Sequence, residues 1–173
     1  NKFAHAFQYD AGYMHDIAEV DLDAIARFSL LQEFGDYRKQ IPLSGWYAAK
    51  LAGCISEDCG PCTQLVVRMA ENDNVDAAIL SALIEGKREL LDDDTRLFYD
   101  YALAVVRHDL DAETHREEIS RKFGQPAIIS AGLAMITGKA YPLMKYATGH
   151  GQACGKVQIN GDDKLGDGML PTT

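Results

Sequence analysis

Apolar residues recur at three- and four-residue spacing along most of the chain, which is the pattern of amphipathic helices. Between residues 12 and 34 this pattern divides near Asp21, and it predicts a pair of helices with the Asp21 side chain capping the second. Pro42 suits a first helical turn, so a further helix is predicted from there through Cys54. The first third of the chain is therefore expected to be helical.

The same spacing predicts helices through the middle of the chain. One is expected to begin around Cys59, and another lies within residues 72–86, where Asn or Asp caps precede it and a glycine ends it. The acidic run at 92–94 favours the N-terminus of the next helix, because negative charge is stabilised there. Asp111 is expected to cap a short helix that ends near Phe123.

The stretch from residue 126 to 146 is apolar and predicts a long final helix. Within it, Gly132 and Gly138 are expected to permit close packing, and Pro142 is expected to introduce a kink. Beyond this helix the sequence is rich in Gly and Asp, with a short strand predicted at residues 156–159.

No run of alternating apolar and polar residues is long enough for a sheet, so the sequence predicts an all-α fold. Residues 1–150 are interpreted as a single helical domain, and residues 151–173 as an irregular C-terminal tail or arm. A length of 173 residues is enough for one domain with a substantial core.

Composition and charge narrow the function classes. A net charge of −9 argues against nucleic acid or an anionic membrane surface as partner, since both need a basic footprint. No apolar run was expected to reach the roughly 20 residues of a membrane span. The first residues also lack the pattern of a secretory signal, so we expect a cytoplasmic protein that binds neither nucleic acid nor membrane.

The main candidate for chemistry is the sequence Cys-Gly-Pro-Cys at residues 59–62. Thioredoxins carry the same four residues after a buried strand, whereas here a helical pattern precedes them, so the chain is not expected to be a thioredoxin. At a helix start, unpaired N–H groups and the positive end of the dipole stabilise a thiolate. Cys59 and Cys62 are therefore predicted to form a redox-active pair, although the neighbouring Glu57 and Asp58 would raise a thiol pKa.

Other interpretations of the cysteines stay open at this point. Cysteines are frequently buried as small apolar residues, without any chemistry. Cys54, Cys59 and Cys62, with Cys154 far downstream, also match the spacing of an iron–sulfur protein, and three cysteines with a histidine could bind zinc. Because Cys54 lies on the apolar stripe of a predicted helix and Cys154 in a Gly-rich tail, we expect neither a metal nor another cofactor.

A C-x-x-C motif that opens a helix after another amphipathic helix, in an acidic helical chain, resembles the carboxymuconolactone decarboxylase / alkylhydroperoxidase AhpD-like superfamily. Residues 42–70 are similar to the central helix pair of that family. Residues 95–109 and 117–136 are similar to its later helices, in which a short helix and a glycine precede a long apolar helix. The resemblance covers about residues 40 to 150 and implies an AhpD-like helical bundle that forms a homo-oligomer.

The resemblance also implies a chemistry. Peroxidase members of the family use Glu-x11-Cys-x2-Cys-x3-His, in which the cysteines cycle between dithiol and disulfide while Glu and His relay protons. In this chain Cys59 and Cys62 match, whereas Tyr47 occupies the Glu position and Val66 the His position. A tyrosine with an ordinary pKa of about 10 is a poor base at neutral pH, and valine moves no proton.

Further candidates for a supporting role are Tyr47, Lys50, Glu57 and His108. Tyr47 could form a hydrogen bond with a neighbour, and Lys50 would lower a thiol pKa if it reached the site, although a solvated position at the surface is expected for it. His108 ends a predicted helix, where a cation is favourable. His150 would contact Cys154 if the segment between them were helical.

These observations predict a thiol–disulfide redox protein that acts on a small-molecule hydroperoxide or disulfide, a possible peroxidase-type oxidoreductase. The alternative is a non-catalytic or ligand-binding protein that keeps the fold without the proton relay. Which cysteine attacks is open, because the helix dipole favours Cys59 whereas the family's relay serves the position of Cys62.

Overall fold

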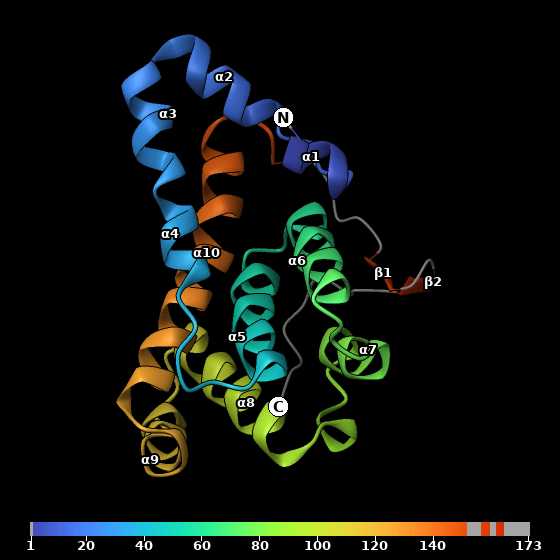
Figure 1. Ribbon diagram of the computed structural model, residues 1–173, viewed down its shortest axis with the longest axis vertical. Coiled ribbons are helices and arrows are strands. Elements are labelled where there is room, and N and C mark those ends of the chain that lie inside the picture. The colour runs from blue at the N-terminus through green and yellow to red at the C-terminus, as the bar shows by residue number, and fades with distance from the viewer. Residues whose placement is uncertain (1, 152–156, 160–161, 165–173) are drawn as a thin grey trace.

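The computed structural model describes residues 2–151, 157–159 and 162–164, and within them the chain is mostly helical (Figure 1). The α-helices are α1 (Lys2–Ala6), α2 (Gly12–Val20), α3 (Leu22–Ser29), α4 (Leu31–Asp36), α5 (Leu43–Ser56), α6 (Gly60–Asn72), α7 (Ala77–Glu85), α8 (Asp93–Arg107), α9 (Asp111–Phe123) and α10 (Gln125–Ala147). A 3₁₀-helix, η1 (Arg88–Leu90), links α7 to α8. The prediction of an all-α fold is confirmed.

Several helix boundaries lie where the capping residues predicted them. The Asp21 side chain accepts a hydrogen bond from the backbone N–H of Asp23 at 2.8 Å, which separates α2 from α3. Gly86 ends α7 in the left-handed conformation, with φ of 68°. The expectation for Asp111 was wrong in detail, because Leu110 precedes α9 and Asp111 lies inside its first turn.

The centre of the fold is the packing of α5 against α8 and α10. Side chains from Trp46 through Cys54 are buried on every side of α5. The closest approach to α10 occurs where Gly53 faces Gly138, since a Cβ atom on either glycine would overlap the backbone of the other helix. The prediction for Gly138 is confirmed, whereas Gly132 has nothing within 4 Å and does not serve close packing.

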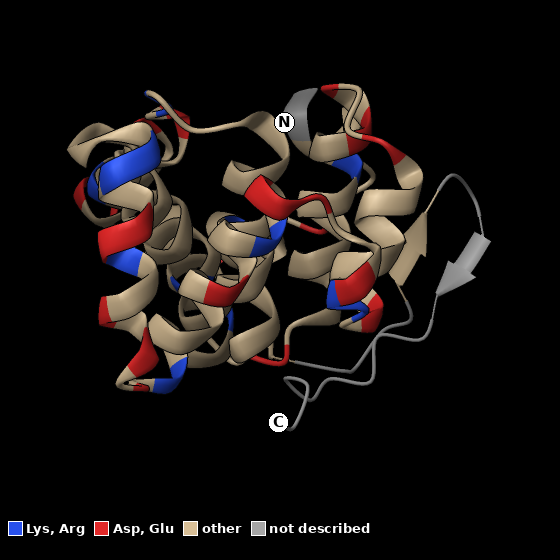
Figure 2. Ribbon diagram, turned by 90° about the horizontal axis from the view of Figure 1, so that it is seen from below, with Lys and Arg blue, Asp and Glu red and all other residues tan. Residues whose placement is uncertain are grey.

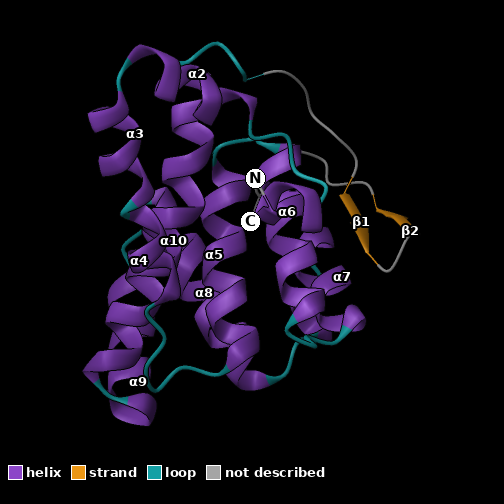
Figure 3. Cartoon of the chain, turned by 45° about the horizontal axis from the view of Figure 1, so that its top comes forward, coloured by secondary structure: helices purple, strands orange, loops and turns teal. Residues whose placement is uncertain are grey.

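The N-terminal helices α3 and α4 lie beside α10, and α2 runs across the top of the molecule in the view of Figure 1 (see also Figure 3). An aromatic cluster joins them to the rest of the molecule. Tyr13 of α2 meets Phe28 of α3 edge to face, with ring centroids 6.2 Å apart, and Phe28 meets Tyr141 of α10 at 5.3 Å. This second apolar cluster packs the N-terminal helices against Leu65 of α6 and against Tyr141 and Met144 of α10.

Part of the C-terminal segment returns to the helical core. Strand β1 (Val157–Ile159) pairs antiparallel with β2 (Asp162–Lys164), so the strand predicted in this segment is confirmed over Val157–Ile159. Val157 and Ile159 are buried against the core, and the Gln64 side chain of α6 donates to the Gln158 carbonyl at 2.8 Å. Strand β1 is therefore docked on α6.

Charge and apolar surface are distributed unevenly. Acidic and basic residues are interspersed along the helices (Figure 2), whereas α10 is apolar over most of its 23 residues. Length and composition alone would let α10 cross a membrane, which the sequence analysis did not expect. The core helix of a soluble protein passes the same test, and α10 packs along α5 through the Gly53–Gly138 contact.

Candidate functional site

Cys59 and Cys62 form a disulfide at the turn between α5 and α6, with their Cα atoms 5.3 Å apart. Cys59 is the N-terminal cap residue of α6. Pro61 follows in the first turn, where backbone N–H groups form no hydrogen bond within the helix, so the N–H that proline lacks is not needed. The Thr63 backbone N–H and hydroxyl both donate to the Cys59 carbonyl, at 2.9 and 3.0 Å. The turn is thereby fixed with the two sulfurs bonded.

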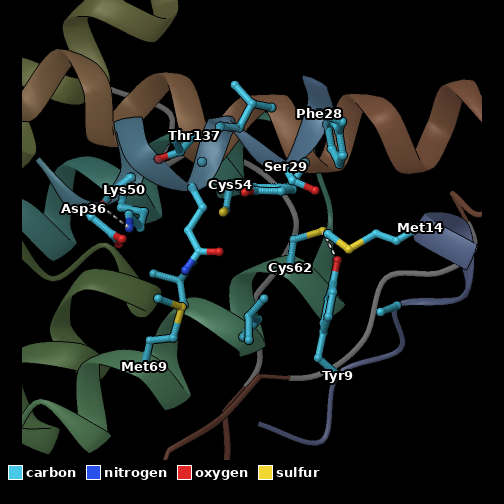
Figure 4. Close-up of a pocket in the computed structure, with 18 of the residues that line it drawn as sticks. Tyr9, Met14, Phe28, Ser29, Asp36, Lys50, Cys54, Cys62, Met69 and Thr137 are labelled. Atoms are coloured by element: carbon cyan, nitrogen blue, oxygen red, sulfur yellow. Dashed lines mark hydrogen bonds between the residues drawn. The ribbon is translucent and has the colours of Figure 1, made fainter. Parts of the chain in front are cut away.

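Cys62 forms part of the wall of a cavity of about 270 Å³ that lies between the N-terminal helices, α5, α6 and α10 (Figure 4). Cys59 is not part of that wall. Both residues are largely buried, with 7% of Cys59 and 3% of Cys62 exposed, so the cavity is the space that Cys62 faces. The two sulfurs of the pair are therefore not equivalent.

The hydroxyl of Tyr9 lies 4.0 Å from the Cys62 sulfur and is drawn toward it in Figure 4. Burial raises the pKa of Tyr9 to about 12, so its hydroxyl keeps its proton at neutral pH and acts as a donor. No pattern in the sequence indicates this contact, because the two residues are 53 positions apart and Tyr9 belongs to no motif. Tyr9 was missed by the sequence analysis.

Tyr13 lines the same cavity and is fully buried; its hydroxyl forms no hydrogen bond of ordinary geometry among the described residues, although it lies close enough to the Tyr9 hydroxyl for each to shift the pKa of the other. Burial raises its pKa, so this hydroxyl is also protonated. The rings of Tyr9 and Tyr13 meet edge to face, and the Lys145 amine lies over both, 5.0 and 5.6 Å from their centroids. The cavity wall thus holds an unused hydrogen-bonding group.

Lys50 does not lie at the surface, so that expectation was wrong. Only 6% of it is exposed, because it projects from the buried helix α5 into the cavity wall. Its amine donates to the Gly35 carbonyl at 3.1 Å and lies 3.9 Å from the centre of the Trp46 ring. Burial lowers the pKa of Lys50 to about 8, since the charged form loses its hydration.

Cys54 also lines the cavity, but its chemistry differs from that of Cys62. It is 2% exposed and forms no disulfide with either of the other described cysteines. Burial raises the pKa of its thiol to about 12, and the nearby Lys50 offsets this only in part. At neutral pH Cys54 is therefore an unreactive thiol beside the candidate site.

The other candidate residues lie outside the cavity wall. Tyr47 is buried, and its hydroxyl donates to the Asp73 carboxylate at 2.7 Å. The Glu57 carboxylate pairs with the Lys139 amine of α10, so its charge is compensated rather than left beside the thiols. His108 is an exposed residue that ends α8 in the left-handed conformation. None of these three is brought to the disulfide cavity.

Val66, at the position where peroxidases of the AhpD-like superfamily have His, is buried in the cavity wall. His150, which follows the end of α10, forms a hydrogen bond with Asp16 at 2.6 Å, and its ring centroid lies 6.3 Å from that of Tyr13, but it does not line the cavity. Cys154 lies outside the described residues. It was the expected contact of His150 and the fourth thiol of the iron–sulfur hypothesis.

Within the described part of the chain, no three His, Cys, Asp or Glu side chains are grouped as metal ligands. Compared with protein-family models, with curated proteins and with solved structures, the chain matches none. Functional interpretation therefore depends on the geometry of the Cys59–Cys62 site and its cavity.

Proposed function

We propose that the protein is a thiol–disulfide oxidoreductase of the AhpD-like type, in which Cys62 reacts with a small-molecule hydroperoxide or disulfide. The observation that supports this most directly is the asymmetry of the pair. Cys62 faces a cavity of ligand size, while Cys59 caps α6 and stands outside the cavity wall. A substrate in the cavity would meet the Cys62 sulfur first.

The reaction with a hydroperoxide would start from the dithiol form. The Cys62 thiolate attacks the terminal oxygen and breaks the O–O bond; the leaving alkoxide takes a proton and departs as the alcohol, and Cys62 becomes a sulfenic acid. The Cys59 thiol then displaces water from that sulfur and restores the disulfide. An external dithiol returns two electrons and two protons by disulfide exchange.

Tyr9 takes the place of the missing proton relay in this proposal. A protonated hydroxyl beside the Cys62 sulfur stabilises the thiolate by a hydrogen bond and can pass a proton to the leaving alkoxide. Tyr9 would be restored to its neutral form by solvent, since its raised pKa makes it a strong base once ionised. Neither the residue at the family's Glu position nor the one at its His position is needed for this step.

The second candidate is a binding protein without turnover. The cavity favours it, because the Tyr13 hydroxyl is buried with no ordinary hydrogen bond to any residue that the structure describes, and because the wall is mostly apolar, as in ligand sites generally. Under this interpretation the disulfide only holds the α5–α6 turn. The two candidates differ in whether the reduced pair consumes an oxidant.

Turnover of an organic hydroperoxide with dithiothreitol as reductant separates them. The redox proposal expects consumption of hydroperoxide by the wild-type protein, loss of all consumption in Cys62→Ser, and nearly unchanged consumption in Cys54→Ser. The Cys54 variant is a matched control, because it removes a neighbouring cavity thiol of the same size. Absence of turnover in the wild type, or its persistence in Cys62→Ser, would rule the redox proposal out.

A further inference from the structure

Lys50 and Lys145 are both buried beside the cavity, with 6% and 4% of their surfaces exposed. Among the described residues, neither forms an ion pair with a carboxylate. Each amine instead lies over aromatic rings, Lys50 over Trp46 and Lys145 over Tyr9 and Tyr13. Buried charges in proteins are ordinarily paired, so this region has an excess of buried positive charge in an acidic chain.

Lys50 is the one of the two that lines the cavity. Within the described part of the chain, its amine donates one hydrogen bond, to the Gly35 carbonyl, out of the three that an ammonium group can donate. The carboxylate of Asp36 also borders the cavity, but Asp36 is exposed, and water screens its attraction for Lys50. A cation with unused donors therefore faces the cavity.

The two ends of the cavity differ in chemistry. Lys50, Asp36 and Thr137 gather at one end, whereas Cys62 and Tyr9 lie at the other (Figure 4). Apolar side chains also line the cavity, among them Leu65, Val66 and Met69 of α6. A volume of about 270 Å³ corresponds to roughly nine water molecules at about 30 Å³ each, the size of a ligand with a comparable number of non-hydrogen atoms.

We infer that the cavity binds a small amphipathic carboxylate, whose anionic group pairs with the Lys50 amine and whose hydrocarbon chain extends along α6 toward Cys62. The carboxylate supplies the counter-ion and the hydrogen-bond acceptors that Lys50 lacks. The chain end then lies near the Tyr13 hydroxyl, which would bind a polar group carried there. The inference that such a carboxylate is the substrate rests on the proposed function, whereas the inference that the cavity binds it does not.

Octanoate is a suitable probe, because its size fits the volume and it carries only the carboxylate and the chain. Equilibrium dialysis of radiolabelled octanoate against the full chain at pH 7 is expected to show saturable binding with one site per chain. Unlabelled 1-octanol and octylammonium, which keep the chain but not the anion, are expected to compete at least about ten-fold more weakly, as for a lost hydrogen bond to a charged group. Equal competition by 1-octanol would overturn the inference without any protein variant.

The variant Lys50→Met keeps the length and volume of the side chain and removes its charge. It is expected to weaken octanoate binding about ten-fold or more, whereas Lys39→Met, which removes an exposed lysine amine that lies over Tyr37, leaves it unchanged. Unchanged binding in Lys50→Met, or no saturable binding by the wild type, contradicts the inference. Cys62→Ser separates the two proposals, since it abolishes hydroperoxide turnover but is expected to keep octanoate binding.

Discussion

At the scale of single residues, the site depends on which polar groups reach the Cys62 sulfur. The C-x-x-C motif alone identified the cysteine pair, because the chemistry of a helix start is local in sequence. Tyr9 and Tyr13 could not be found this way, since Tyr9 lies in the loop between α1 and α2, Tyr13 lies in α2, and neither carries a motif. Lys50 was recognised as a candidate but was expected at the surface, because the spacing of apolar residues does not reveal that α5 is buried on all sides.

The Tyr9 hydroxyl is expected to accelerate the reaction of Cys62. In Tyr9→Phe, the rate of hydroperoxide consumption should fall about three- to ten-fold, because one hydrogen bond to the thiolate and one proton donor are lost. Tyr99→Phe is the matched control: it removes another buried hydroxyl, which donates to the Leu83 carbonyl away from the cavity. Similar rates for Tyr9→Phe and the wild type in a stopped-flow measurement would exclude Tyr9 from the mechanism.

At the scale of elements, the close crossing of α5 and α10 positions the residues of both helices that line the cavity. The sequence predicted both helices and the close-packing role of Gly138, which the structure confirms. It gave Gly132 the same role wrongly, because both glycines lie in one apolar helix and only the direction of each Cα–H bond distinguishes them. It also missed Gly53, the opposing glycine on α5.

This crossing gives a prediction about stability. Gly138→Ala is expected to lower the free energy of unfolding by about 1–3 kcal/mol, because the new methyl group overlaps the Lys50 carbonyl of α5. Gly132→Ala should instead raise it by about 0.5–1 kcal/mol, since alanine favours the helix and nothing lies within 4 Å of the added carbon. Urea unfolding of the two variants measures both values, and equal effects would contradict the packing described.

At the scale of the whole molecule, composition and periodicity were enough to predict an all-helical chain, but not the way helices α1 to α4 fold back on it. The contact of α2 and α3 with α10 through Tyr13, Phe28 and Tyr141 joins residues more than a hundred positions apart. Such contacts depend on side-chain shape in three dimensions, which the spacing of apolar residues does not encode. The cavity was therefore beyond prediction although its cysteines were not.

The buried tyrosines and Cys54 predict how stability depends on pH. Burial raises the pKa of Tyr9 and Tyr99 from 10.0 to about 12, and that of Cys54 from 9.0 to about 12. The unfolded chain thus releases these protons at lower pH than the folded chain, so stability that is fully present below pH 9 is lost as the pH rises toward 12. Lys50 acts in the opposite direction between about 8 and 10.5, because its folded pKa is lowered.

Ionisation of Tyr9, Tyr99 and Cys54 lowers the stability as the pH rises, and of the groups named only Lys50 raises it. The free energy of unfolding is therefore expected to fall between pH 10 and 12. Urea unfolding at a series of pH values measures this, and Tyr99→Phe should flatten the fall. A stability that stays constant over this range would show that these hydroxyls and the Cys54 thiol are not buried in solution.

The central claim is that Cys62, through its cavity, is the sulfur that meets an oxidant. The most direct measurement uses Cys59→Ser, which removes the thiol that would close the disulfide and so preserves a sulfenic acid. After one equivalent of an organic hydroperoxide and then dimedone, peptide mass spectrometry is expected to find the adduct on Cys62. An adduct on Cys54 in place of Cys62, or none at all, would contradict the account.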